Sequence, residues 1–242
     1  MTFKQIKYLP AVVCLLPAVQ ANACISCNRQ VRNGIYDSMF YPNLLLMLSA
    51  FIVLTIIVVL LARISRLRYQ ARIRLLKDKD LLSPVPLTTA AMVLGIGLGG
   101  FMDGIVLHQM LQWHEMLSAK IPPTDYVGKS VNMFWDGIFH FFCLAVVFTG
   151  VLLLWKLTGR PDINRSGKLL SGGMLMGWAL FNIVEGIIDH HILKLHNVVE
   201  YAADHHTGNT IFLGASAVML LAGYFLVRKA DRYNNLHGNP LH

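Results

Sequence analysis

Hydrophobic and polar positions along this chain are segregated into long blocks. Five apolar blocks, over residues 44–62, 81–102, 131–155, 169–188 and 210–227, are each long enough to cross about 30 Å of hydrocarbon as a helix. A backbone in lipid must satisfy its own hydrogen bonds, so each block is expected to be helical. The pattern predicts an all-α, polytopic membrane bundle of five transmembrane helices.

A shorter apolar stretch precedes these blocks. Two lysines, an apolar core over residues 9–19 and the sequence Ala21-Asn22-Ala23 follow one another in residues 1–23, as in a cleaved secretory signal peptide. A first membrane anchor is the alternative, but the core falls short of the roughly 20 residues that a spanning helix needs. We therefore expect the mature chain to begin at Cys24.

Composition agrees with a membrane location, and the basic residues indicate an orientation. The chain is 55% hydrophobic and 14% charged, which excludes an ordinary soluble domain. Segments 63–80, 156–168 and 228–242 hold seven, four and three Lys or Arg residues, whereas 24–43, 108–130 and 190–209 hold two, two and one. The positive-inside rule then predicts that the mature N-terminus faces the periplasm or the cell exterior and that the C-terminus is cytoplasmic. The net charge of +8 needs no nucleic-acid partner.

This topology divides the chain into six parts. After the signal come a short periplasmic segment (24–43), the first transmembrane helix (44–62) and a basic cytoplasmic loop (63–80). A four-helix membrane module (81–227) and a cytoplasmic tail (228–242) follow.

Histidine is concentrated at the predicted outer face. Eight of the ten histidines lie in outer loops or in the outer halves of spans, namely His108, His114, His140, His190, His191, His196, His205 and His206. Ionisable groups in a membrane are costly and usually mark a functional site. The outer, periplasm-facing side is therefore expected to carry the function.

These histidines belong to a repeated motif. Asp103-Gly104-Ile105, with His108 and His114 after it, matches Glu185-Gly186-Ile187, with His190 and His196 after it, at identical spacing. The third span carries a shorter relative, Asp136-Gly137-Ile138 with His140. In a regular helix, 11 residues separate each acid from its second histidine by roughly 16 Å. The ligands therefore form two layers, or each helix breaks after its glycine.

Imidazoles beside carboxylates are ligands that suit copper, zinc or iron. The candidate metal ligands are His108, His114, His140, His190, His196, Asp103, Asp136, Glu185 and Asp189, followed by His191, His205, His206, Cys24 and Cys27. Haem is a rival, with His108 and His190 as axial ligands, but an acid accompanies every motif. A purely structural hydrogen-bond network is the alternative without a metal.

The motif Cys24-Ile-Ser-Cys27 would face the outside directly after the signal. Asn28 stands where a c-type haem signature requires histidine, so covalent haem is excluded there. A disulfide and a thiolate pair for a soft metal such as copper(I) both remain open.

Two classes of function follow. The first is a metal-handling protein whose partners are the lipid bilayer and a respiratory or other membrane metalloenzyme that receives the ion. The second is a membrane metalloenzyme, a hydrolase or oxidase with a lipid or other apolar substrate, in which Asp103 or Asp136 acts as general base. Transport is disfavoured because the cytoplasmic halves of the spans contain almost no polar residues.

The segments GFMDGIVLHQMLQWHEML, NMFWDGIFH and FNIVEGIIDHHILKLHNV resemble the signature segments of DUF2243, a bacterial family of multi-pass membrane proteins. The resemblance covers about residues 81–227 and implies a four-helix membrane module, without implying an activity. Similar members often carry paired histidines where Glu115 and Asn197 stand in this chain. Residues 24–80 look like an addition to that module.

Overall fold

The computed structural model describes residues 28–76 and 81–237, and these residues form an all-helical bundle. Its elements are α2 (Arg29–Ile35), α3 (Phe40–Leu76), α4 (Val85–Met102), η3 (Asp103–Met110), α5 (Tyr126–Trp155), α6 (Gly167–Glu185), η4 (Gly186–Ile192) and α7 (His205–His237). The π-helices η3 and η4 continue α4 and α6. Within these described ranges, five helices are long and apolar enough to cross a membrane, which confirms the predicted fold class. The predicted signal and Cys24 and Cys27 lie outside the described residues.

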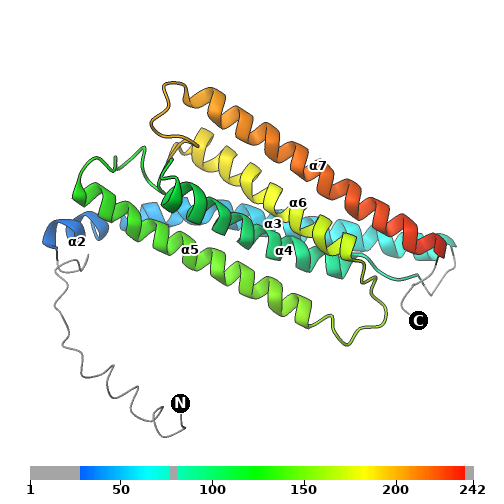
Figure 1. Cartoon of the computed structure of the whole chain (residues 1–242). Coiled ribbons are helices and arrows are strands. Elements are labelled where there is room, and N and C mark those ends of the chain that lie inside the picture. Colours follow the sequence, from blue (N-terminus) through cyan, green and yellow to red (C-terminus); the bar gives the residue numbers. More distant parts are fainter. Residues whose placement is uncertain (1–27, 77–80, 238–242) are drawn as a thin grey trace, which may run out of the picture.

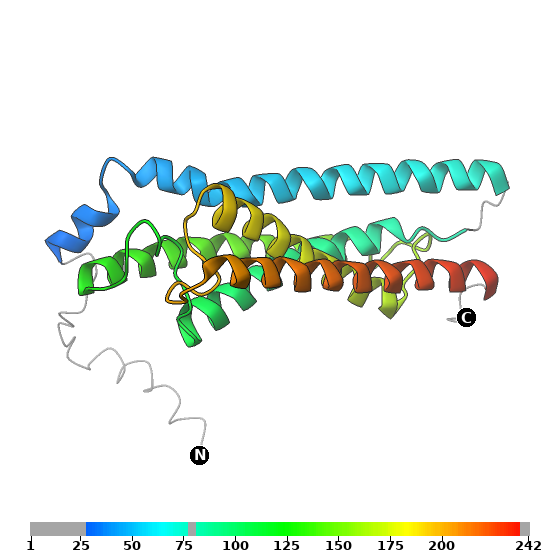
Figure 2. The ribbon, with the colours of Figure 1, turned by 90° about the horizontal axis from the view of Figure 1, so that it is seen from above.

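Helices α4 and α6 form the centre of the bundle. Helix α5 packs against α4, α7 packs against α6, and α3 lies across one face of this layer against both central helices (Figures 1 and 2). Large apolar side chains remain exposed on α3, α5 and α7. Such surfaces are stable in contact with lipid acyl chains.

Two glycines allow the central helices to touch through their backbones. A Cβ atom at Gly95 would overlap the carbonyl of Met174, and one at Gly177 would overlap the carbonyl of Met92. Small residues permit this approach in membrane proteins. Gly95 and Gly177 are 82 positions apart, as are Met92 and Met174, and the same offset separates Asp103 from Glu185. The crossing therefore has an approximate two-fold axis that exchanges the two halves of the sequence repeat.

Two helices are longer than the sequence pattern predicted. Helix α3 continues through the basic residues as far as Leu76, where a loop over 63–80 was expected. This stretch contains no glycine or proline and is rich in arginine and leucine, which favour helix. Arg72 also pairs with Asp231 of α7 at 3.0 Å. At the other end of the bundle, α7 begins at His205, so His205 lies in a helix rather than in the predicted loop.

The polar connections differ between the two ends of the bundle. The π-helices and the segments after them lie at one end with α2, and the connection from α5 to α6 lies at the opposite end with the end of α7 (Figure 1). The candidate ligands gather at the π-helical end.

Candidate metal centre

The two π-helices bring each acid of the repeat to its first histidine. Five residues along a regular α-helix leave side chains about 140° apart around the axis, whereas the wider π-turn brings such residues together. Asp103 Oδ2 lies 3.0 Å from His108 Nε2. In the second half, Glu185 Oε1 lies 2.8 Å from His190 Nε2.

A reversal of the chain then returns the second histidine of each motif to the same acid. Gln112 and Lys194, again 82 positions apart, both have φ of 51°, the left-handed conformation that ends a helix sharply. His114 Nε2 lies 3.7 Å from Asp103 Oδ1, and His196 Nε2 lies 3.4 Å from Glu185 Oε1. The helices thus depart from α-geometry after the acid, and the ligands are not spread over two layers.

The four imidazoles of the repeat form one buried cluster, which we call the histidine cluster (His108, His114, His190 and His196). Ring centroids are 4.5 Å apart for His108 and His114, and 4.8 Å apart for His190 and His196. Across the halves, His108 lies 5.8 Å from His196 and His114 lies 6.0 Å from His190. The ring centroids of His114 and His196, which the approximate two-fold axis relates to each other, are 4.6 Å apart. Exchanging the two halves of the sequence repeat therefore gives similar centroid distances.

The cluster presents unpaired ligand atoms to a common interior. Within the described part of the chain, all four Nε2 atoms are buried without a hydrogen-bond partner, as are both carboxylate oxygens of Glu185 and Oδ2 of Asp103. The close acid–imidazole contacts therefore lack hydrogen-bond geometry. The ligand atoms fall into two groups of three whose members lie within 4.8 Å of one another, His108 with His114 and His196, and Glu185 with His190 and His196.

Contacts at Nδ1, on the side of the ring away from the cluster, orient two of the four imidazoles. His108 Nδ1 lies 2.9 Å from Asp136 Oδ1, which also accepts the Met116 amide at 2.9 Å. His114 Nδ1 lies 2.9 Å from the carbonyl oxygen of Val198. With the proton on Nδ1, each ring directs the lone pair of Nε2 into the cluster, the arrangement in which imidazole binds a metal.

His196 lies in the segment after η4, outside the membrane-spanning part. Burial, reinforced by the nearby imidazoles of His114 and His190, lowers the pKa of His196 well below its usual value. This ring is therefore neutral near pH 7 and free to coordinate an ion.

Four buried carboxylates adjoin the cluster, from Asp103, Asp136, Glu185 and Asp189. Among the described residues, none of the four pairs with lysine or arginine, and Asp103, Asp136 and Glu185 instead lie close to histidine nitrogens. Asp189 Oδ1 is buried without a hydrogen-bond partner. Burying an ionised carboxylate without a counter-charge costs free energy. A cation bound at this end of the bundle would lower that cost.

His140 is not brought into the cluster. It stacks on Phe101 with centroids 5.9 Å apart, and a Cβ atom at Gly104 would overlap its Nε2. Asp136, one turn earlier on α5, contacts His108 instead. The predicted compact pair of Asp136 and His140 is therefore divided between two environments.

The remaining candidate histidines lie on the surface. His191 is exposed, with Nδ1 2.8 Å from the carbonyl of Gly186, and His205 is exposed, with Nε2 2.9 Å from the carbonyl of Glu200. His206 is exposed in the same turn. None of the three reaches the cluster.

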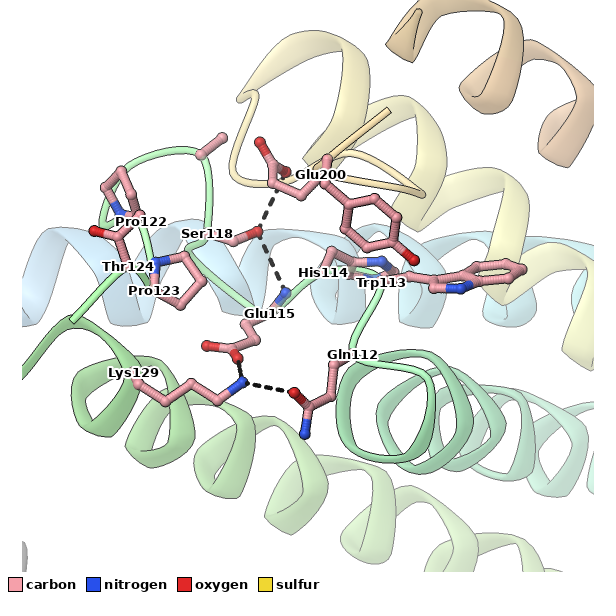
Figure 3. A pocket seen from close by; sticks show the side chains of 12 residues that line it. Gln112, Trp113, His114, Glu115, Ser118, Pro122, Pro123, Thr124, Lys129 and Glu200 are labelled. Atoms are coloured by element: carbon pink, nitrogen blue, oxygen red, sulfur yellow. Dashed lines mark hydrogen bonds and ion pairs between the residues drawn. The ribbon is translucent and has the colours of Figure 1, made fainter. Parts of the chain in front are cut away.

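A cavity of about 460 Å³ opens beside His114, which forms part of its wall (Figure 3). Lys129 forms an ion pair with Glu115 in this wall and donates to Gln112 Oε1 at 3.4 Å. On the opposite side, the Ser118 hydroxyl donates to Glu200 Oε2 at 3.2 Å. Burial raises the pKa of Glu115, although Lys129 opposes that effect. The cavity therefore extends to the side of His114, whose Nε2 atom is itself buried.

Sequence reasoning did not assign roles to Lys129 or Glu200. Glu115 was noted only as a departure from paired histidines, although it directly follows a ligand candidate, and Glu200 comes four residues after His196. The short spacing between each acid and a loop histidine was the sequence feature that could have identified these two residues. No sequence feature identified Lys129, because its partner depends on the fold of the 111–125 segment.

Comparison with known proteins places the chain in a family. A family model described as "Predicted membrane protein (DUF2243)" matches residues 90–230, a range that contains both copies of the motif and the whole histidine cluster. No curated protein matches the chain, and no solved structure matches it. Because the match covers more than half of the sequence, the chain belongs to the DUF2243 family of membrane proteins.

Proposed function

We propose that this protein binds a transition metal, copper, iron or zinc, at the histidine cluster. The observation that carries the proposal is the convergence of four buried imidazoles whose Nε2 atoms have no hydrogen-bond partner in the described residues. Buried polar atoms in proteins are nearly always paired. A metal ion would supply the missing partner for several of them at once.

The neighbouring charges favour an ion over a purely structural network. A network of neutral side chains would pair its donors with acceptors, but neither oxygen of Glu185 accepts a hydrogen bond within the described residues. Four carboxylates near the cluster lack a lysine or arginine partner among the described residues. A divalent cation would compensate this charge while neutral imidazoles coordinate it.

The packing of the rings favours an ion over haem. A haem held by His108 and His190 would need a flat cavity between them for its macrocycle. His114 lies 4.5 Å from the first ring and 6.0 Å from the second, measured between centroids. The space that the macrocycle would need is occupied by imidazole.

The biological role proposed for the site is metal handling at the periplasmic face of a bacterial inner membrane. The most basic connections belong to the end of the bundle opposite the cluster, so the positive-inside rule directs the cluster outward. The cavity beside His114 would let an ion be exchanged with that side. A respiratory or other membrane metalloenzyme is the proposed recipient.

Metal analysis of the detergent-purified protein tests this proposal. We expect a stoichiometric transition metal in the wild type and a loss of at least tenfold in the variant His108→Ala/His190→Ala. The matched control is His205→Ala/His206→Ala, which removes two exposed imidazoles and should retain the metal. A folded wild type that stays metal-free when loaded with copper, iron and zinc in turn would reject the proposal.

A membrane metalloenzyme is the second candidate, and a groove on the lipid side favours it. A cavity of about 480 Å³ is lined mainly by apolar residues of α4 and α6, and a separate one of about 130 Å³ is lined in part by Asp103. The two cavities share the lining residues Met102, Val106 and Trp178. An apolar substrate could approach the site from this side. Asp103 suits the role of general base, whereas the contacts of Asp136 with His108 and Met116 favour a positioning role.

Turnover of a lipid or other apolar ester by the metal-loaded protein would test the enzyme hypothesis. The variant Asp103→Asn should lose turnover if that carboxylate is the base. Full turnover in Asp103→Asn would exclude it as base, and a metal-loaded protein inert toward such substrates would leave metal handling as the function.

A further inference from the structure

The cluster is built from two copies of one ligand set, and this bears on how many ions it holds. Each copy consists of an acid, a histidine five residues later and a second histidine returned by a left-handed turn. The acid–histidine distances are 3.0 and 3.7 Å in the first copy and 2.8 and 3.4 Å in the second. A carboxylate with two imidazoles is a complete protein ligand set for a transition metal that keeps an open position. Whatever ion one copy binds, the other copy presents the same three groups to a second.

We propose that the histidine cluster is a dinuclear centre that holds two divalent transition-metal ions, one at each copy of the motif. The first position is formed by His108 and His114, with Asp103 3.0 Å from His108 Nε2 and 3.7 Å from His114 Nε2. The second is formed by Glu185 and His190, and His196 belongs to both groups of ligand atoms. This proposal rests on the metal-binding function proposed above and specifies its nuclearity.

The grouping of ligand atoms supports two positions. In the part of the chain that the structure describes, candidate ligand atoms form two groups of three rather than one group of four. His108 and His190 belong to different groups, and His196 belongs to both. A single ion with four imidazole ligands would require all four Nε2 atoms to surround one point.

His196 has the features expected at the junction of two ions. Both of its ring nitrogens are buried without a hydrogen-bond partner among the described residues. Its ring lies 4.6 Å from His114 in the first copy and 4.8 Å from His190 in the second, measured between centroids. It can therefore contribute to either position without a change of backbone.

Charge supports the same count. Asp103, Asp136, Glu185 and Asp189 together carry four negative charges when ionised, all of them buried. A buried carboxylate must be compensated by a cation or take up a proton, so one divalent ion would leave two of the four to be protonated. Two divalent ions bring the centre to neutrality with the imidazoles uncharged.

The two positions should be separable by single substitutions. His108→Ala removes a ligand only from the first position and His190→Ala only from the second, and the two-fold relation makes them matched variants. The exposed His191, next to His190 in sequence, supplies the control His191→Ala. If truncation to alanine unfolds either variant, His108→Asn and His190→Asn keep a polar side chain of similar size.

The experiment measures the number of copper, iron or zinc ions per chain in the full-length detergent-purified protein, together with the electron paramagnetic resonance spectrum of the copper-loaded form. We expect two ions per wild-type chain with a spin-coupled signal, and one ion with an uncoupled signal in His108→Ala and in His190→Ala. The control His191→Ala should keep two coupled ions. One uncoupled ion in the wild type, lost in both variants, would overturn the dinuclear proposal while leaving metal binding intact. Absence of any ion from the folded wild type would overturn both.

Discussion

The two halves of the cluster carry the same candidate ligands, but the hydrogen bonds that hold those side chains differ. In the first half, Nδ1 of His108 contacts Asp136 and Nδ1 of His114 contacts the carbonyl of Val198. In the second half, Nδ1 of His190 and Nδ1 of His196 have no hydrogen-bond partner among the described residues. Hydrogen bonds behind a ligand fix its tautomer and orientation before the ion arrives. The first half is therefore preorganised, and we expect it to bind its ion more tightly.

The largest expected effect is on the free energy of unfolding. It should come from a substitution at the close contact between α4 and α6, which holds the two halves together. A methyl group at Gly177 would overlap the carbonyl of Met92 in α4, and backbone cannot move aside as a side chain does. Gly177→Ala should lower the free energy of unfolding by about 3 kcal/mol, since overpacking typically costs 1–3 kcal/mol. Denaturant titration of the detergent-solubilised protein measures it.

Gly137→Ala is the matched control for this substitution. Gly137 lies within α5, where an added Cβ meets no atom within 4 Å. Alanine should be neutral there or stabilising by about 0.5–1 kcal/mol, because it favours helix more than glycine does. Equal destabilisation by the two substitutions would mean that the α4–α6 contact is not as close as described.

The next largest effect should be on metal affinity, and it should come from removing the carboxylate that contacts His108 Nδ1. Asp136→Ala deletes the acceptor of both His108 Nδ1 and the Met116 amide. Loss of such an outer partner commonly weakens metal affinity by 10–100-fold, and the weakening should be confined to the first position. Competition with a chelator of known affinity measures it, and Asp204→Ala, at an exposed acid, is the control. An unchanged affinity in Asp136→Ala would remove the asymmetry argued above.

A smaller effect on metal affinity is expected from Asn209, which acts on His114 only through Val198. Asn209 accepts the amide of Val198 at 3.0 Å, and the carbonyl of Val198 contacts His114. Asn209→Ala should loosen this segment and weaken affinity by about two- to tenfold, less than Asp136→Ala, because it acts through a second hydrogen bond. Chelator competition provides the comparison, and a loss larger than that of Asp136→Ala would contradict the order.

The smallest effect should concern the rate of metal uptake. Lys129 places a positive charge in the wall of the cavity, paired with Glu115. Lys129→Met should speed the association of a divalent ion about two- to threefold at low ionic strength, and the gain should vanish at high salt. Stopped-flow measurement against Lys120→Met, at an exposed lysine, tests it. A gain that persists at high salt would point to a steric cause.

The grouping of these residues in space was predictable because the motif that carries them repeats in the sequence. Asp103, His108 and His114 match Glu185, His190 and His196 at fixed spacing, and the structure brings these six residues together. Their five-helix scaffold followed from apolar block lengths alone.

Contacts that depend on departures of the backbone from regular α-helical geometry could not be predicted. Regular α-geometry separates Asp103 from His114 by roughly 16 Å, and only the π-turn and the left-handed Gln112 reduce this to 3.7 Å. The same geometry led to the expected pairing of Asp136 with His140, whereas the fold turns Asp136 toward His108. Contacts between helices depend on rotation about each helix axis, which residue spacing within one helix does not reveal.

X-ray absorption spectroscopy at the edge of the bound metal tests the central claim, that neutral imidazoles of the cluster coordinate an ion, most directly. The account predicts a first shell near 2.0–2.1 Å with the multiple-scattering signature of histidine, lost in His108→Ala/His190→Ala and retained in His205→Ala/His206→Ala. A folded, metal-bound wild type whose first shell lacks imidazole would contradict it.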